Sequence, residues 1–193
     1  GRLNALGGSN STWGGDPILS GLFGKGAFSV GYSQFRTDGF RTNADQDDKV
    51  ANVFAQYDFT PQTSVQAEYR YRDIESGDVA LRFLPQNVFL GQRNTEERHT
   101  ARIGARHSFS QGSILLGSLM YQDAKFRSRD NQFLGLPDAV ADTNNPVKSW
   151  SGELQHLFRS KSWGLTSGVG YFNLNGKLDT SLSLFGVDSS ITE

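Results

Sequence analysis

The chain has 193 residues, no cysteine and a net charge of -1, with 19 Lys plus Arg against 20 Asp plus Glu. The lack of cysteine excludes a disulfide framework and a thiolate metal site, and the balanced charge argues against a nucleic-acid-binding protein. Glycine numbers 22 and aromatic residues reach 12%, which is typical of a sheet protein with many turns. The longest apolar run, residues 114–121, is too short for a membrane-spanning helix, whereas strands of a membrane barrel need only about 9–11 residues.

Alternation of apolar and polar residues predicts eight strands, because successive side chains on a strand point to opposite faces. Their approximate ranges, in chain order, are 16–23, 27–36, 49–59, 64–73, 98–109, 114–123, 148–158 and 163–173. The fourth is the clearest, since Val65, Ala67 and Tyr69 alternate with Gln66 and Glu68.

A short repeat marks one end of these strands. A phenylalanine, a short polar turn and a serine recur from Phe59, Phe109 and Phe158, with a degenerate copy from Phe23. Two alternating segments flank each copy, which describes a β-hairpin with a tight turn. We expect tight turns near 24–26, 60–63, 110–113 and 159–162. We expect long polar loops at 37–49, 74–98, 124–148 and 174–193.

Short turns that alternate with long loops are typical of outer-membrane barrels. Aromatic residues gather toward both ends of the predicted strands, and we assign nine of them to the lipid interfaces: Phe23, Phe59, Tyr69, Tyr71, Phe109, Tyr121, Phe158, Trp163 and Tyr171. Two aromatic girdles around an aliphatic band are expected at two lipid interfaces, whereas a soluble β-sandwich more often places large aromatics in mid-strand. The sequence therefore favours a membrane barrel over a soluble sandwich.

We predict an all-β fold: an antiparallel up-and-down transmembrane β-barrel with about eight strands visible. Its predicted location is the outer membrane of a Gram-negative-type (diderm) bacterium. Residues 1–193 are expected to form part of one larger barrel domain, because both ends fall on the long-loop side. The aliphatic face would meet lipid, and the polar face would enclose water.

The predicted lumen-lining residues are the polar members of the second face: Asn52, Gln56, Asp58, Gln66, Glu68, Arg70, Arg72, Arg102, Arg106, Glu153 and Gln155. Arginines on neighbouring strands would repel each other unless Glu68, Asp58 or an anionic solute paired with them. Two interpretations stay open, a salt-bridge ladder that stiffens the wall and a basic strip that biases an aqueous path toward anions.

No catalytic residue, metal site or cofactor is predicted. His99, His107 and His156 lie far apart without a second ligand at metal spacing. The acidic segment 43–48 lacks the glycine and the distal glutamate of a calcium loop, and segment 21–26 lacks the spacing of a phosphate-binding loop. We therefore expect that the chain is not an enzyme.

The overall pattern resembles the barrel of TonB-dependent-receptor-like outer-membrane proteins. More narrowly, segments 35–43 (FRTDGFRTN), 64–78 (SVQAEYRYRDIESGD, after Gln56) and 102–110 (RIGARHSFS) resemble a C-terminal barrel of large outer-membrane proteins that carry tetratricopeptide repeats upstream. The resemblance implies membrane lipid as a partner, and a periplasmic repeat or a plug domain in the same parent chain. It gives no catalytic residue.

The leading hypothesis is an integral outer-membrane barrel that acts as a transport pore or receptor-like channel. Two alternatives remain, an export conduit for a polymer or protein fed by periplasmic repeats, and a structural or adhesive module with a closed lumen.

Overall fold

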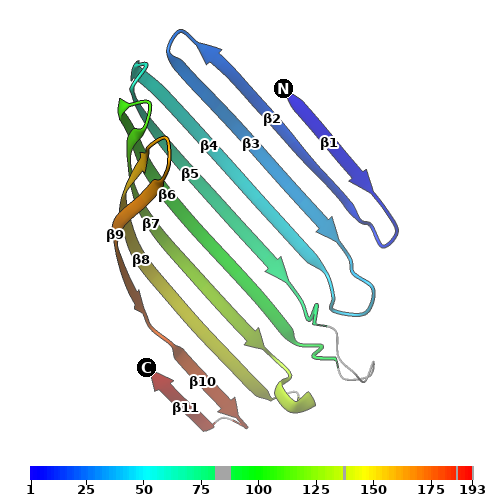
Figure 1. The fold of residues 1–193 in the computed structure, drawn as a ribbon. Helices are drawn as coiled ribbons and strands as arrows, with labels where there is room; N and C mark the ends of the chain where they lie inside the picture. Colours follow the sequence, from blue (N-terminus) through cyan, green and yellow to red (C-terminus); the bar gives the residue numbers. More distant parts are fainter. Residues whose placement is uncertain (81–87, 137, 186, 193) are drawn as a thin grey trace.

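The computed structural model describes residues 1–80, 88–136, 138–185 and 187–192. These residues form one antiparallel sheet of eleven strands (Figure 1). The strands are β1 (Arg2–Gly7), β2 (Trp13–Phe23), β3 (Gly26–Thr37), β4 (Gln46–Thr60), β5 (Thr63–Ser76), β6 (Gln92–Ser110), β7 (Ser113–Asp130), β8 (Ala139–Arg159), β9 (Gly164–Gly176), β10 (Asp179–Leu184) and β11 (Val187–Thr192). A short 3-10 helix, η1 (Phe133–Gly135), lies between β7 and β8.

Each strand from β1 to β8 pairs with the next one in sequence, which is the predicted up-and-down order. β8 is long enough to pair with two strands in succession, with β9 along 147–159 and with β10 along 139–144. The interruption between β9 and β10 lies beside Pro146, which has no N–H to give to a ladder, and Lys177 N donates to Pro146 O at 3.1 Å.

Tight turns join the strands at residues 24–25, 61–62, 111–112 and 160–163. The repeated phenylalanines explain their shape. Register shifts between Asp58 and Thr60, and between Ser108 and Ser110, leave Phe59 and Phe109 as the extra residues of β-bulges beside two of the turns. The phenylalanine-to-serine repeat in the sequence therefore marks the turn end of successive hairpins.

The opposite ends of the strands differ from the sequence expectation. β6, β7 and β8 have 19, 18 and 21 residues, so strands occupy much of the expected loops 74–98 and 124–148. β10 and β11 likewise lie in the expected loop 174–193. Polar and charged side chains occupy both faces there, so the alternation is lost although the backbone ladder continues. Residues 81–87 of the first expected loop lie outside the described residues.

The count of eleven strands replaces the predicted count of about eight, since β1, β10 and β11 fall outside the predicted ranges. All three are only six residues long, and β10 and β11 are rich in serine and threonine. Short segments of that composition give little hydrophobic alternation.

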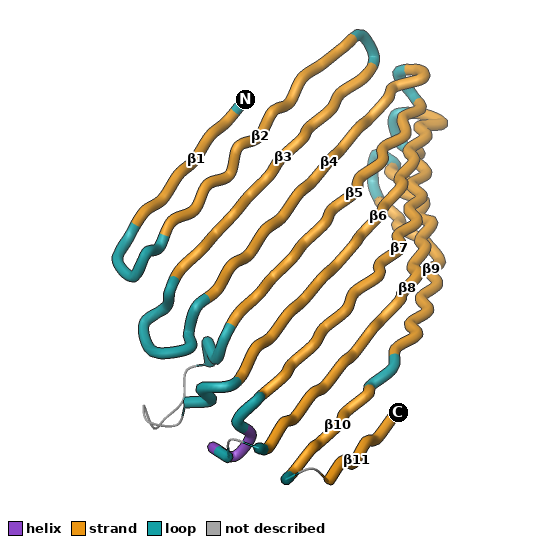
Figure 2. The backbone as a smooth tube through the Cα atoms, turned by 180° about the vertical axis from the view of Figure 1, so that it is seen from behind, coloured by secondary structure: helices purple, strands orange, loops and turns teal. Residues whose placement is uncertain are grey.

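The described residues form a single curved layer, and none of them makes a second layer over either face (Figure 2). Among the described residues, Ala44 and Ala139 are the only buried hydrophobic ones. Val53, Ile103, Leu119 and Leu154 are between 47% and 57% exposed although they lie in mid-strand. A soluble domain covers such a face with another layer of structure, and none lies over it among the described residues.

A search of the described residues for helices found none that is both long and apolar enough to cross a membrane.

Candidate functional site

Strand register places the eleven predicted polar residues on one face of the sheet. Between β4 and β5, Asn52 pairs with Arg70, and between β5 and β6, Glu68 pairs with Arg102. The same face continues onto β7 and β8, where Glu153 pairs with Ser118. We call this surface the polar face. It brings together side chains that lie up to a hundred residues apart in the sequence.

The nine predicted interface aromatics lie on the other face, which we call the apolar face. Phe23, Phe59, Phe109 and Trp163 lie at the tight-turn end and are between 56% and 87% exposed. Toward the other end, the rings of Tyr121 and Trp150 pack at 4.6 Å between centroids. On β5 the band of apolar and aromatic side chains on this face ends after Tyr71, because charged residues follow on the same face.

Part of the polar face is a ladder of ion pairs. Arg72 donates to both carboxylate oxygens of Asp48, from Nε at 3.2 Å and from Nη2 at 2.7 Å. Arg102 binds Glu68 through an ion pair, and Asn52 donates to the other oxygen of Glu68 at 2.9 Å. Two of the four predicted arginines, Arg72 and Arg102, are thus paired with carboxylates across strands.

Nearer the tight turns, polar contacts run along single strands. Gln56 donates to Asp58 at 3.1 Å on β4, and Gln155 donates to Glu153 on β8. Asp58 and Glu153 therefore form no ion pair within the described part of the chain.

Arg70 and Arg106 form no hydrogen bond or ion pair with any residue that the structure describes. They line two different hollows. A cavity of about 560 Å³ is lined by Arg106 together with the carboxylates of Asp58 and Glu153. A second cavity of about 330 Å³ is lined by one carboxylate, Glu68, and by four arginines: Arg70, Arg72, Arg98 and Arg102.

Arg98 and Thr100 also lie on the polar face, and the sequence prediction omits them. Arg98 lies directly opposite Arg72 in the register and forms an ion pair with Glu96 at 2.5 Å. Arg98 stands where the expected loop 74–98 meets the predicted strand 98–109, and Thr100 lies inside that strand, but neither belongs to the predicted lumen-lining set. Glu97 and His99, the residues on either side of Arg98, are also polar, so no apolar–polar alternation marks this end of the strand in the sequence.

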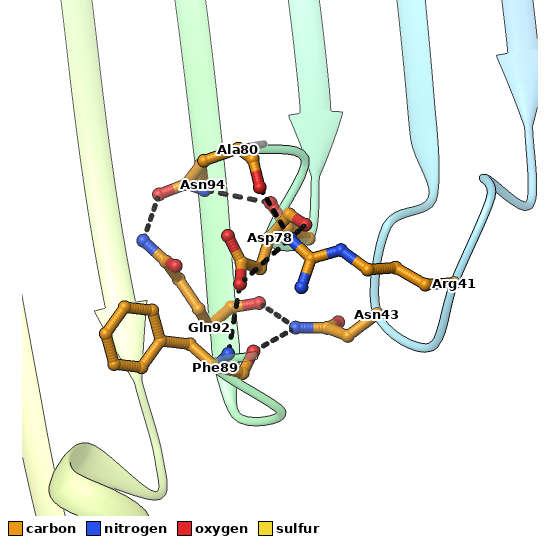
Figure 3. A network of polar contacts seen from close by, with 8 residues as sticks. Arg41, Asn43, Asp78, Ala80, Phe89, Gln92 and Asn94 are labelled. Atoms are coloured by element: carbon orange, nitrogen blue, oxygen red, sulfur yellow. Dashed lines mark hydrogen bonds and ion pairs between the residues drawn. The ribbon is translucent and has the colours of Figure 1, made fainter. Parts of the chain in front are cut away.

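A second polar cluster, which we call the loop cluster, joins the β3–β4 loop to the β5–β6 loop (Figure 3). It lies at the strand ends away from the tight turns. Asp78, whose side chain is 1% exposed, forms an ion pair with Arg41 at 3.4 Å. Asn43 donates to the carbonyl oxygens of Phe89 and Gln92 at 2.6 and 3.0 Å. This loop cluster draws on the segments 35–43 and 64–78, on Phe89 in the loop before β6 and on the start of β6, and it could not be read from spacing.

A glycine is required where these loops meet. A Cβ on Gly77 would lie 2.2 Å from Asn43 O, so the β5–β6 loop can approach the β3–β4 loop only without a side chain at this position. Asp78 N then donates to Asn43 O at 2.5 Å.

The carboxylates of the acidic segment 43–48 form ion pairs with lysine and arginine side chains of the same chain. Asp45 pairs with Arg93 at 2.5 Å, Asp47 with Lys49 at 3.3 Å, and Asp48 with Arg72. These carboxylates therefore stabilise strand and loop packing.

The three histidines lie on the apolar face. His107 and His156 each share a hydrogen bond of 2.8 Å with a hydroxyl group beside a tight turn, on Thr63 and Ser113. His99 lies at the other end of the band, between Tyr69 at 2.7 Å and a carboxylate. Each histidine has a polar partner in the sheet, as expected of interface residues.

An ion pair on the apolar face, beyond the aromatic band, gives a pH-dependent prediction. Arg127 on β7 donates to both oxygens of Asp142 on β8, at 2.9 and 2.5 Å. Hydrogen bonding from Arg127 lowers the pKa of Asp142, against burial, which raises it. The stability that the pair contributes is therefore complete above the unfolded pKa of about 3.8 and is lost as the pH falls through the lower folded value.

We expect Arg127→Gln to lower the free energy of unfolding at pH 7 by less than about 1 kcal/mol, because Arg127 is 53% exposed and solvent screens the pair. Denaturant unfolding of both proteins between pH 2 and pH 7 checks this. The difference between them should disappear at the acid end, and a difference that stays constant with pH would contradict it.

Comparison of the sequence with known protein families and with curated proteins gave no match. Comparison of the fold with solved structures gave matches at a probability of 1.00. FpvA of P. aeruginosa bound to a heterologous pyoverdine and iron has a TM-score of 0.71 at 12% identity, over 93% of this chain and 28% of that chain. The ferric citrate transporter FecA has a TM-score of 0.66 at 14% identity, over 99% and 32%.

BauA, the ferric preacinetobactin receptor of Acinetobacter baumannii, has a TM-score of 0.69 at 9% identity, over 99% of this chain and 32% of that chain. The chain thus spans about a third or less of these proteins. The matches confirm the predicted fold class, an all-β antiparallel sheet of the kind that forms the β-barrels of these proteins.

Proposed function

We propose that this sheet is part of the wall of an outer-membrane barrel that acts as a transport pore or receptor-like channel. One observation carries the proposal: an exposed apolar face with aromatic ends lies directly behind a polar face with ion pairs and cavities. Strands β2 to β8 and β10 are hydrogen-bonded to neighbours on both sides, as a lipid-embedded sheet requires, and β1, β9 and β11 each pair with one strand in the part of the chain that the structure describes.

In this proposal the eleven polar residues of the polar face line an aqueous interior, and the nine aromatics anchor the apolar face at the two lipid interfaces. The strands β6 to β8 then reach far past the band, since on β8 eleven residues, 139–149, lie beyond Trp150 and span about 37 Å. Such an extension is consistent with the large barrels of outer-membrane transporters, of about 22 strands with a plugged lumen.

The solved neighbours support receptor-like uptake over a passive porin, because FecA is described as a transporter of ferric citrate and BauA as a receptor for a ferric siderophore. Membrane lipid is the first partner in this proposal. A plug domain or a periplasmic repeat of the same parent chain is the second.

An export conduit fed by periplasmic tetratricopeptide repeats is the second candidate. It is favoured by the segments 35–43 and 64–78, which resemble the barrel of repeat-containing proteins and which meet in the loop cluster at Arg41 and Asp78. Helical repeats upstream of the barrel in the full-length protein would favour export, and a plug with a TonB box would favour import.

Conductance of the full-length protein in planar lipid bilayers tests transport as such. We expect stepwise conductance, after removal of any segment of the protein that fills the lumen. Insertion into the bilayer without conductance after that removal would contradict a transport role and would favour a structural or adhesive module.

A further inference from the structure

We call the cavity of about 330 Å³ on the polar face the arginine cavity. Among the described residues, not all of its four arginines are paired with a carboxylate. Arg72, Arg98 and Arg102 each have one carboxylate, on Asp48, Glu96 and Glu68 respectively. Arg70 is the fourth arginine of this cavity and has no partner among the described residues. One guanidinium charge is therefore left without a counter-charge in a hollow of about 330 Å³.

The register explains why this charge is held in place. Arg70 lies on β5 two residues from Arg72, which is about 7 Å along the strand. Its cross-strand partner on β6 is Thr100, with Arg98 and Arg102 at the two diagonal positions. Diagonal neighbours lie about 7–8 Å apart, within reach of long side chains. Arg72, Arg98 and Arg102 thus lie around Arg70 with their own carboxylates, and Glu68, two residues before Arg70, is already bound to Arg102. An anion beside Arg70 would supply the counter-charge that Arg70 lacks within the described part of the chain.

The neighbouring cavity shows that this excess is local. Arg106 lines the cavity of about 560 Å³ and is also unpaired in the described part of the chain. Two carboxylates, of Asp58 and Glu153, line the same cavity. The two hollows of one face therefore carry opposite charge balances, and only the arginine cavity calls for an added anion.

We propose that the arginine cavity is a binding subsite for a compact oxyanion, a carboxylate, phosphate or sulfate group of a solute in the lumen. This inference deepens the proposed transport function and rests on it for its setting inside a barrel. Arg70 supplies a planar fork of donors that suits two oxygens of such a group. The Thr100 hydroxyl, opposite Arg70, is a further donor at the same level of the wall.

Titration of the full-length protein in detergent micelles with inorganic phosphate, followed by ³¹P NMR, tests the subsite without need of conductance. We expect saturable binding, and about a tenfold or larger loss of affinity in Arg70→Gln, because a hydrogen bond to a charged group is removed. Arg70→Lys, which keeps the charge and loses the fork, should fall between the two.

The matched control is Arg36→Gln, which removes the same charge from an exposed arginine of the apolar face. It should bind phosphate as the wild type does. Equal affinity of Arg70→Gln and wild type, or the lack of saturable binding, would overturn the subsite. Phosphate binding by a protein that never conducts would overturn the transport proposal and leave the subsite supported.

Discussion

Arginine in place of Ala67 is expected to lower the free energy of unfolding by about 2–4 kcal/mol, which is the cost of a cationic side chain on the lipid face near the bilayer midplane. Ala67 lies on β5 between Ala55 of β4 and Ile103 of β6, and Ile103 is 57% exposed. There is room for the larger side chain, so the cost comes from desolvation of the charge. Urea unfolding of the protein in lipid vesicles measures it, and Ala105→Arg should behave in the same way.

The matched control is Gln66→Arg, one residue away and on the polar face. Gln66 lies opposite Gly104 and lines the cavity of about 560 Å³, so an added guanidinium would remain in water. We expect a change within about 0.5 kcal/mol. If Ala67→Arg were as stable as Gln66→Arg, the assignment of the apolar face to lipid would be wrong.

Replacement of Asp78 by alanine is the second change with a large expected effect. The carboxylate of Asp78 is buried, pairs with Arg41 at 3.4 Å and accepts a hydrogen bond from Phe89 N at 3.0 Å. Its removal leaves the guanidinium of Arg41, which is 17% exposed, without that counter-charge. We expect a loss of about 3–5 kcal/mol in the local stability of the loop cluster.

Amide hydrogen exchange measures this local stability. Amides of Ala44, Gly77 and Asp78, which donate between the loops or within them, should exchange faster in the variant. Asp38→Ala removes an exposed carboxylate from the same β3–β4 loop and serves as the control, with a change within about 0.5 kcal/mol. Equal protection in both variants would show that Asp78 does not hold the loops together.

The hairpin ends and the two faces could be predicted from the sequence because both depend on local pattern. The repeat at Phe59, Phe109 and Phe158 recurs wherever a strand ends in a tight turn. Alternation in β4 to β8 then sorts side chains between the faces, since a strand with a period of two allows no other arrangement. Neither inference needs knowledge of which strands are neighbours.

The far ends of the strands could not be predicted, because water lies on both sides of the sheet there and selects for no apolar face. In β6, Glu96 and Arg98 alternate with Glu97 and His99, so charge or polarity occupies both faces. The ladder of backbone hydrogen bonds continues through this segment without any hydrophobic signal. The loop cluster is hidden for a related reason, since Arg41 and Asp78 meet across 37 residues.

The sequence predicted which residues lie on the polar face, but not which of them contact one another. The polar face was found by alternation, but which arginine has a partner depends on register between strands. Arg72 finds Asp48 on β4, at the edge of an expected loop, whereas Arg70 finds none in the described part of the chain. Neither a uniform basic strip nor a complete salt-bridge ladder therefore describes the polar face.

Site-directed spin labelling tests the central claim most directly, because the chain contains no cysteine and single cysteines can be placed at will. Ile103 and Leu119 are opposite each other on the apolar face, and Gln66 and Ser118 lie on the polar face at nearly the same level. With the full-length protein in lipid vesicles, labels at Ile103 and Leu119 should collide with oxygen and avoid a water-soluble nickel chelate. Labels at Gln66 and Ser118 should show the reverse, and the same accessibility on both faces would contradict a wall between lipid and water.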